Sequence, residues 1–385
     1  MAQTVLITGT RAPAAIDLGR SFAREGWRVL GADRLAWPIA RRSRAFAAHH
    51  RLPRANADHR AFADRLIALV EREGVDLIVP TCEEAFFIAR HKERIETRCR
   101  VAVSDFETMR KLHDKTGLPA LVAGLGIEAP ETYRAETRAE LEDVLERLGD
   151  GVVLKPAFSR FGSRALIRPS AAAIAMVRPA PCDPWAVQRF VDGDEVCIYG
   201  VARDGILTAF SAYRPEYRVG KGSSIMFRPA IVPALQTFAS AFAARYRIEG
   251  QFAFDTIRAR DGRWFALECN PRATSGVHMF DPADRLATAF TGDAMIPQSR
   301  DGASMVGLAM LLIALPRSLV FGGFGAAARA WRLAEDVVAR KGDRGPGLTQ
   351  WLALGEGLTL ALRHHCSPLA ATTSDIEWNG EALLE

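Results

Sequence analysis

The sequence of 385 residues is poor in lysine, with only six lysines among its 50 basic residues. They are Lys92, Lys111, Lys115, Lys155, Lys221 and Lys341. The arginines that take the place of lysine are scattered along the chain, so the net charge of +5 forms no continuous basic stripe of the kind that binds nucleic acid. We therefore expect no nucleic-acid partner, whereas a small anionic substrate suits the mild positive charge.

The sequence also has few cysteines and no long apolar run. Its six cysteines are widely spaced without a C-x-x-C pair, which disfavours a structural zinc site and favours reduced thiols. The most apolar segment, residues 305–315, is shorter than the roughly 20 residues that span a bilayer, and Pro316 ends it. No basic region precedes a long apolar stretch at the N-terminus. We expect a cytoplasmic protein without a membrane segment, in which residues 305–315 form a buried helix suited to a homodimer contact.

The composition is that of an ordered globular protein, 49% hydrophobic and 25% charged, and the length suggests two or three folding units. The first hundred residues alternate short apolar strands with helical patterns, which predicts a parallel sheet with helices on its faces. The strands are expected at 5–7, 29–32 and 77–79, and the helices at 14–25 and 61–73. The first turn, residues 9–13, lacks the G-x-G-x-x-G spacing, so a dinucleotide-binding dehydrogenase is disfavoured.

Beyond about residue 108 the pattern changes to a charged helix at 138–148 and then to strands and hairpins. The tail beyond 300 is mostly helical in pattern, with glycine and proline as breakers. We predict four regions with the limits 1–108, 109–187, 188–300 and 301–385.

A hairpin over residues 251–272 carries the most informative acidic residues. Asp261-Gly262 between two alternating apolar runs predicts a two-residue turn, which places Asp255 directly opposite Glu268, with Asn270 on the same face. The other face is expected to carry Phe252, Phe254, Phe265 and Leu267.

Two carboxylates that lie opposite one another repel unless a cation lies between them. Mg²⁺ takes oxygen ligands and commonly uses one or two carboxylates together with substrate phosphates. We therefore predict a Mg²⁺ site at Asp255, Glu268 and Asn270, with Mn²⁺ as the alternative ion and a solvated acidic pair as the alternative interpretation. Arg272 follows closely and is placed to grip a phosphate or carboxylate; a plain surface arginine is its alternative.

A second hairpin, with Asp204-Gly205 at its turn, predicts that Glu195 faces Arg214. Glu195 then either forms a cross-strand salt bridge or binds a ribose hydroxyl. Residues 214–228 form a basic, glycine-containing stretch, interpreted either as a loop that closes on an anionic substrate or as a solvated loop. Its candidate side chains are Arg214, Arg218, Lys221 and Arg228.

Two lysines stand where a compact ammonium is useful. Lys155 ends an apolar strand and opens the loop 156–163, whose amides and hydroxyls can cradle phosphate; Ser159, Gly162 and Ser163 are its candidates. Lys115 is a similar case. Glu83 follows a strand of the N-terminal sheet at its carboxyl end and is either a substrate residue or a first-turn helix acid.

Taken in order, several segments resemble the ATP-grasp superfamily, and within it the carbamoyl-phosphate-synthase-like ligases. They are D-K-T-G-L-P at 114–119, G-I-E-A-P-E-T at 126–132, V-V-L-K-P at 152–156, Q-R-F-V-D-G-D-E at 188–195 and L-E-C-N-P-R at 267–272. The resemblance covers roughly residues 1–280. It implies an α/β fold, with an N-terminal parallel-sheet pre-grasp domain, a two-subdomain ATP-grasp unit with antiparallel sheets, and a mostly helical C-terminal region.

The resemblance also implies roles for residues. Lys115 and Lys155 would contact ATP phosphates, the connector from Gln188 through Phe190 and Val191 would hold the adenine, and Glu195 the ribose. The implied reaction is ATP-dependent joining of a carboxylate to an amine or thiol through an acylphosphate, with release of ADP and phosphate. Arg272 would steady the acylphosphate, and the 214–228 stretch with Glu83 would select substrates. The alternatives are a carboxylase or carbamoyl-phosphate-type enzyme and a nucleotide-binding protein without turnover.

Overall fold

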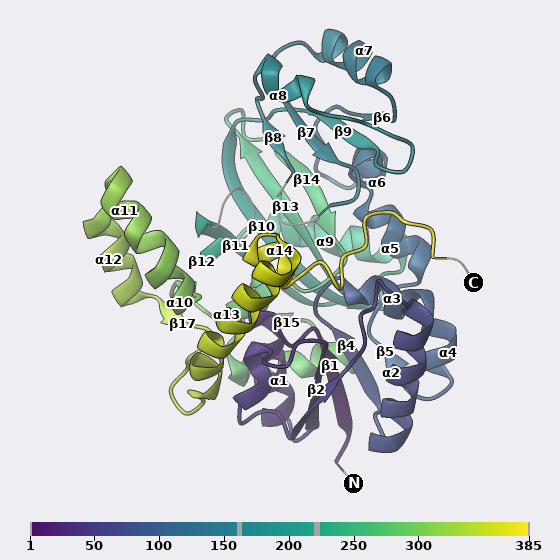
Figure 1. Cartoon of the computed structure of the whole chain (residues 1–385), viewed down its shortest axis with the longest axis vertical. Coiled ribbons are helices and arrows are strands. Elements are labelled where there is room, and N and C mark those ends of the chain that lie inside the picture. The colour runs from purple at the N-terminus through teal and green to yellow at the C-terminus, as the bar shows by residue number, and fades with distance from the viewer. Residues whose placement is uncertain (1, 160–163, 219–223, 384–385) are drawn as a thin grey trace.

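The computed structural model describes residues 2–159, 164–218 and 224–383. Three β-sheets with flanking helices make up this part of the chain (Figure 1). Three predicted site residues, Gly162, Ser163 and Lys221, lie outside the described residues.

The N-terminal sheet is parallel, as predicted, with the strand order β3-β2-β1-β4-β5. Its strands are β1 (Thr4–Thr8), β2 (Arg28–Asp33), β3 (Ala48–Arg51), β4 (Leu77–Pro80) and β5 (Arg100–Val101). The accompanying helices are α1 (Pro13–Arg24), α2 (His59–Glu73), α3 (Glu84–Arg90) and α4 (Lys92–Glu96). Every residue of β1 is buried, because Val5 and Ile7 pack in the core that contains α1, while Leu6 packs in the core that contains α2 and α3.

A small antiparallel sheet follows, with the strand order β6-β9-β7-β8. It contains β6 (Thr132–Ala135), β7 (Val152–Pro156), β8 (Leu166–Ile167) and β9 (Trp185–Arg189). The helices α5 (Phe106–His113) and α6 (Leu118–Val122) lead into it, and α7 (Arg138–Leu148) and α8 (Ala171–Ala175) flank it. The charged helix predicted at 138–148 is α7, and its start is fixed by a capping box between Thr137 and Glu140.

The large sheet is mostly antiparallel, with the path β14-β13-β10-β11-β12-β16-β17 and β15 beside β11. Its strands are β10 (Gly193–Arg203), β11 (Ile206–Arg218), β12 (Ser224–Ala230), β13 (Gly250–Ala259), β14 (Trp264–Asn270), β15 (Ile296–Pro297), β16 (Ser304–Met305) and β17 (Glu335–Asp336). Helix α9 (Pro233–Tyr246) covers one face, where Phe254 packs against Phe238 and Phe242 with ring centroids 5.0 and 4.8 Å apart. The stretch 214–228, predicted as a loop, is strand at both ends, because β11 and β12 pair there.

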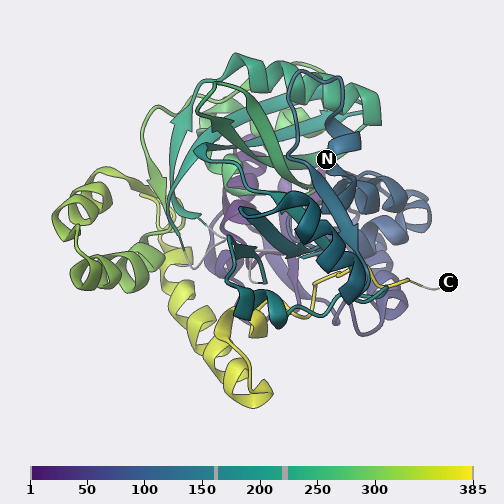
Figure 2. The same ribbon diagram turned by 90° about the horizontal axis from the view of Figure 1, so that it is seen from above.

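The C-terminal region is mostly helical, as predicted, and its helical hairpin projects to one side of the molecule (Figures 1 and 2). The helices are α10 (Gly307–Ala309), α11 (Leu315–Phe321), α12 (Phe324–Leu333), α13 (Gly345–His364) and α14 (Pro368–Ala371). The segment 305–315 is only partly the buried helix that was predicted. Met310 and Ala314 are buried, whereas Leu311, Leu312 and Ile313 are exposed, because only one side of this segment packs on the core formed with β12 and β16. No helix among the described residues is both long and apolar enough to cross a membrane.

The end of the chain returns to the N-terminal sheet, an arrangement that the sequence pattern did not indicate. Trp378 is 1% exposed and stacks on Phe86 with a centroid distance of 4.9 Å, and it also meets Phe158 edge-on at 5.2 Å. One aromatic cluster therefore joins the C-terminal segment, the N-terminal sheet and the loop after β7.

We predict that Trp378→Ala lowers the free energy of unfolding by about 3–5 kcal/mol, the usual cost of deleting a large buried aromatic side chain. Trp331→Ala is the matched control, because Trp331 is 38% exposed and its replacement should cost much less. Urea titrations of the two variants measure the difference. Equal losses would show that the chain end is not docked as described.

Candidate active site

A cavity of about 680 Å³ is lined by residues of the small and large sheets, of the segments that follow strands of the N-terminal sheet, and of the C-terminal region. The predicted site residues in its lining are Lys155, Gln188, Phe190, Val191, Glu195, Arg218, Asp255, Glu268, Asn270 and Arg272. Strands β7 and β9 contribute one wall, and β10, β11, β13 and β14 contribute the facing wall. The cavity therefore lies between two antiparallel sheets, and it extends toward the loops after β1, β2 and β4.

The acidic pair has the predicted register, because Asp255 of β13 lies opposite Glu268 of β14. The predicted turn is wrong, however. Ala259 donates a backbone hydrogen bond to Arg263, so the turn contains three residues, with Gly262 at φ 89°. A bulge between Asp255 and Thr256 shifts the register back by one, and the two deviations cancel at the acidic pair.

The bulge also redistributes the faces of β14. Leu267 lines the cavity together with Glu268, instead of joining the apolar face as predicted, whereas Cys269 packs in the core beneath α9. Asn270 lies on the cavity side, and its amide nitrogen donates to Glu268 Oε1 at 3.3 Å. The three predicted metal ligands therefore share one face.

The two carboxylates have opposite pKa shifts. Burial, and then the charge of Glu268, raise the pKa of Asp255 to about 7. Burial also acts to raise the pKa of Glu268, but the ammonium groups of Lys115 and Lys155 outweigh it, so this pKa lies below its usual value. Without a further cation the pair therefore favours a single negative charge near neutral pH.

The two lysines reach the pair from different elements. Lys155, at the end of β7, donates from Nζ to the carbonyl of Leu267 at 2.9 Å, and Lys115 donates to the carbonyl of Ser159 at 2.7 Å. Burial lowers the pKa of Lys155 to about 8, although Glu268 and Asp255 act in the opposite direction. Backbone oxygens hold both ammonium groups beside the acids. The negative oxygens of a polyphosphate bound there would neutralise the positive charge of the two lysines.

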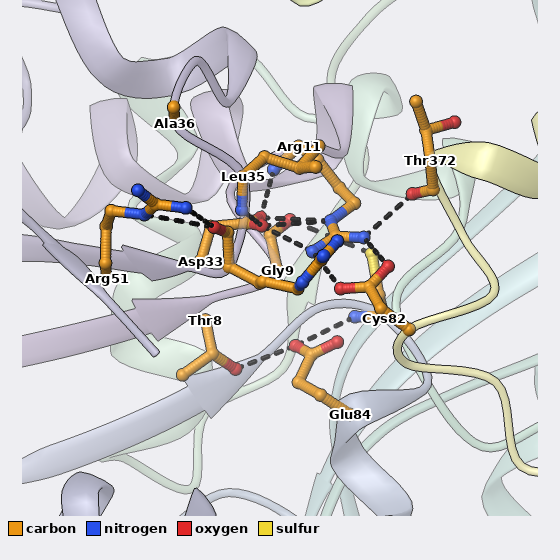
Figure 3. A network of polar contacts seen from close by, with 12 residues as sticks. Thr8, Gly9, Arg11, Asp33, Leu35, Ala36, Arg51, Cys82, Glu84 and Thr372 are labelled. Atoms are coloured by element: carbon orange, nitrogen blue, oxygen red, sulfur yellow. Dashed lines mark hydrogen bonds and ion pairs between the residues drawn. The ribbon is translucent and has the colours of Figure 1, made fainter. Parts of the chain in front are cut away.

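Arg272 lies next to the same site. Its Nη2 donates to Asn270 Oδ1 at 3.1 Å, and its Nε lies 3.7 Å from Oε1 of the buried Glu83. Glu83 is 1% exposed and does not line the cavity, so its contact is with Arg272 and its predicted role toward substrate is not supported. Its neighbour Glu84 is a first-turn acid of α3 and accepts from Thr8 Oγ1 at 2.7 Å (Figure 3).

The second hairpin does not have the predicted register. Pairs near its turn fit the prediction, but a bulge between Val201 and Ala202 shifts the remainder by one residue. Glu195 therefore does not face Arg214. Its partner is Arg218, whose Nη2 lies 2.5 Å from Glu195 Oε1, and both residues line the cavity.

Two predicted substrate residues lie on the opposite face of the sheet. Arg214 and Arg228 pair with one another across β11 and β12, and both side chains are exposed and absent from the cavity lining. Arg228 forms its ion pair with Glu216 at 2.7 Å. Because successive strand residues alternate between faces, Tyr213 and Pro215 line the cavity in place of Arg214.

The predicted phosphate contact Ser159 is half-buried and donates from its hydroxyl to the carbonyl of Pro156 at 3.2 Å.

Other residues of the cavity lining were not predicted from the sequence. Val153 and Ile257 line the cavity two residues away from Lys155 and Asp255, so strand alternation would have found them. By contrast, no local pattern indicates Thr372 and Thr373, which reach the cavity from the distant C-terminal region.

Among the described residues, no group of three or more His, Cys, Asp or Glu side chains converges on a point that could hold a metal ion. The acidic pair instead offers two carboxylates and the amide oxygen of Asn270, an all-oxygen set of the kind that Mg²⁺ uses with phosphates and water. The raised pKa of Asp255 fits this set, because a second negative charge beside Glu268 is unfavourable until a cation neutralises it.

Comparison with known proteins places this geometry in a fold class. No protein-family model matches the sequence. The mitochondrial arginine-specific large chain of carbamoyl phosphate synthase from Neurospora crassa is 24% identical over 196 residues, which are 46% of this chain and 17% of that protein. The match therefore spans a small part of the relative's length.

Solved structures cover far more of the chain. The structure resembles N5-carboxyaminoimidazole synthetase from Staphylococcus aureus complexed with ADP, with a TM-score of 0.63 and 14% identity over 83% of this chain and 87% of that one. It also resembles an L-amino acid ligase from Bacillus licheniformis, with a TM-score of 0.56 and 18% identity over 72% and 69%. These proteins are ATP-grasp ligases, and the chain has their fold, as the sequence predicted. Within this class, the sequence match is to a carbamoyl phosphate synthase.

We predict that the ionisation of Asp255 contributes a loss of stability to the ligand-free protein as the pH rises from about 4 to 7, opposite in sign to the contribution of His49 and His91, whose pKa values burial lowers to about 4. The pKa of Asp255 is about 7 in the folded state, against an ordinary value of 3.8 for an aspartate in an unfolded chain, so the folded state binds more protons over this interval. Asp255→Asn should remove this contribution, so that the stability of the variant relative to the wild type increases from pH 4 to 7, and should stabilise the ligand-free protein above pH 7 by roughly 1–3 kcal/mol, the scale of relieving a buried unpaired charge. Denaturant titrations across pH measure both effects.

The control is Asp194→Asn, which changes an exposed aspartate of the neighbouring strand β10. It should leave the slope unaltered. A wild-type slope that survives in Asp255→Asn would show that another group titrates.

Proposed function

We propose that the protein is an ATP-dependent ligase that activates a carboxylate as an acylphosphate and transfers the acyl group to an amine. The observation that carries this proposal is the convergence of Asp255, Glu268, Asn270 and Lys155 in the lining of the cavity, with the buried Lys115 near enough for its charge to lower the pKa of Glu268. The two carboxylates favour a bound cation and the two lysines beside them favour a bound anion. A metal-bound polyphosphate supplies both charges.

The nucleotide would occupy the part of the cavity between the small and large sheets. Val153, Ile257 and Leu267 offer apolar surface for the adenine beside the backbone of Phe190 and Val191, and Glu195 lies close enough to contribute to the ribose. Lys115 and Lys155 would hold phosphate oxygens. The ADP bound by the Staphylococcus aureus neighbour supports a nucleotide here.

Asp255, Glu268 and Asn270 would hold Mg²⁺, with Mn²⁺ as a substitute. The metal supplies charge neutralisation of the phosphates during phosphoryl transfer. The chain's own residues orient the reactants: Lys155 is fixed to β14, and Arg272 is fixed by Asn270 and Glu83 beside the acids. Arg272 is then positioned to bind the carboxylate whose oxygen attacks the γ-phosphorus.

The proposed reaction has two steps. A carboxylate oxygen forms a bond to the γ-phosphorus while the bond from that phosphorus to the bridging oxygen breaks, and ADP leaves. An amine nitrogen then attacks the acyl carbon, loses a proton and expels phosphate. The L-amino acid ligase among the structural neighbours favours an amine over a thiol as the acceptor.

A carbamoyl-phosphate-type reaction is the second candidate, favoured by the sequence match over 46% of the chain. It would use bicarbonate as the carboxylate. ADP release that depends on bicarbonate, with no response to organic acids, would identify it.

The central prediction concerns Glu268→Gln, which keeps the shape of the side chain and removes its charge. ADP release with a panel of organic acids and amines should fall at least ~100-fold, the scale of losing a directly acting electrostatic group. Glu146→Gln, at an exposed position of α7, is the control and should keep full activity. Activity retained in Glu268→Gln would rule out the metal assignment.

We also propose a cytoplasmic homodimer. The exposed apolar side chains of the projecting hairpin, such as Leu319, Val320 and Phe321, are the surface that supports self-association. Light scattering during gel filtration measures the mass, and a monomer at tens of micromolar would contradict this part of the proposal.

A further inference from the structure

Part of the cavity lining differs in chemistry from the proposed phosphate site. This part, called here the acyl pocket, is lined by Leu35, Trp37, Ile39, Phe227, Val306 and Ala353. Leu35, Trp37 and Ile39 come from the segment after β2, Phe227 from β12, Val306 from the start of α10, and Ala353 from α13. These six side chains are apolar or aromatic, and so are suited to hydrocarbon rather than to a charged group. The polar lining residues near them are Thr372, Thr373 and His278, whose ring stacks on Phe227 and whose Nδ1 lies 2.8 Å from Asp17 Oδ2.

The charged residues of the lining are divided unequally between the two parts. The acidic residues among the described lining are Glu195, Asp255 and Glu268, and all three lie on β10, β13 and β14. None belongs to the elements that form the acyl pocket. A substrate ammonium group placed there would lose its water without gaining a carboxylate partner, and a second carboxylate would be equally unpaired.

Arg11 lines this end of the cavity, but its guanidinium is already bound. Its Nη2 lies 2.5 Å from Asp33 Oδ1, its Nη1 lies 2.6 Å from Asp375 Oδ1, and Nη1 also donates to the carbonyl of Thr372 at 2.7 Å. Figure 3 shows Arg11 between Asp33 and Thr372. Two aspartates neutralise this arginine, so it holds the C-terminal segment rather than a substrate anion.

Arg272 differs, because the ion pair that it forms among the described residues is longer, with 3.7 Å between its Nε and Glu83 Oε1. Its contact with Asn270 places it beside the proposed metal ligands, and Ala273 and Thr274 continue the lining from it toward the acyl pocket. A carboxylate bound by Arg272 would point its oxygens toward the phosphate site. The remainder of the molecule would extend into the acyl pocket.

The acyl pocket is held in shape by the C-terminal helices. The carboxylate of Glu356 on α13 accepts hydrogen bonds from the backbone of Ala36 and Trp37, each at 2.8 Å. Asp375 anchors the following segment through Arg11. The walls from residues 35–39 and from α13 are therefore fixed to one another, and little ordering is needed on binding.

We propose that the acid activated by this protein is an apolar monocarboxylate, whose uncharged aliphatic or aryl body occupies the acyl pocket while its carboxylate binds Arg272. This inference rests on the proposed ligase function for its reaction, but the binding of the acid can be measured separately. Amino acids and dicarboxylates are excluded as preferred acids, because their second charge has no partner in the pocket.

The test compares acids of one length with different ends: hexanoate, 6-aminohexanoate and adipate. Full-length protein with Mg·ATP and hydroxylamine should convert the acylphosphate of hexanoate to its hydroxamate, which is measured by its ferric complex. Hexanoate should exceed each of the other two by more than tenfold in kcat/KM. Within the series from propionate to hexanoate, kcat/KM should rise about fourfold per methylene, the value for complete burial of each one.

A variant tests the location of the acyl pocket. Ala353→Phe fills it from α13 and should reduce kcat/KM for hexanoate at least tenfold and for propionate less than threefold. Leu348→Phe is the matched control on the same helix, at a position that is 64% exposed, and should change neither value. Equal losses for both acids in Ala353→Phe would overturn the assignment.

Binding is measured in parallel as the rise in melting temperature on adding each acid with Mg·ADP. A larger rise with hexanoate but no hydroxamate would support the acyl pocket and refute the ligase function. Hydroxamate formed mainly from adipate, 6-aminohexanoate or an amino acid would support the ligase and overturn the acyl pocket. If hexanoate gives no rise in melting temperature and no hydroxamate, the acyl pocket is overturned as well.

Discussion

The repulsion between Asp255 and Glu268 is the constraint around which the active-site region is built. Two carboxylates paired across neighbouring strands beneath a cavity destabilise the sheet unless positive charge compensates them. The ligand-free protein meets part of this need with Lys115 and Lys155, and part with a raised pKa at Asp255. The remainder is the charge that we assign to a divalent cation.

The neighbouring elements support this pair. Lys155 brings the small sheet to the large sheet through the carbonyl of Leu267, and Lys115 holds the start of the loop after β7 through Ser159. Arg272 connects Asn270 to Glu83 at the edge of the N-terminal sheet. The small sheet, the large sheet and the segment after β4 of the N-terminal sheet thus contribute to one charge arrangement, so a ligand bound there would stabilise their close approach.

Much of the fold could be read from the sequence, because alternating strands and helices and one charged amphipathic helix have strong local periodicity. The site residues were harder. Asp261-Gly262 indicates a reversal of the chain, but neither the three-residue turn nor the bulge at Asp255 has an equally clear signal. Their cancellation made the acidic pair predictable, whereas the single bulge at Val201 gave Glu195 a different partner. A one-residue shift also explains why strand pairing alone misplaced Leu267.

The C-terminal region shows the other limit of sequence reasoning. Asp375 and Trp378 act through partners that lie hundreds of residues away in the chain, at Arg11 and Phe86. Such contacts follow from the completed fold and leave no local periodicity to detect. They nevertheless shape the cavity, since α13 and the segment after it provide Ala353, Thr372 and Thr373.

The most direct test of the central claim is the number of protons released when Mg·ADP binds at pH 6.5, measured by titration calorimetry in buffers of different ionisation enthalpy. Asp255 is largely protonated at this pH and must ionise to hold the metal, so the wild-type protein should release more protons per nucleotide than Asp255→Asn does. Equal proton release by the two proteins, or nucleotide binding that is indifferent to Mg²⁺, would contradict the account.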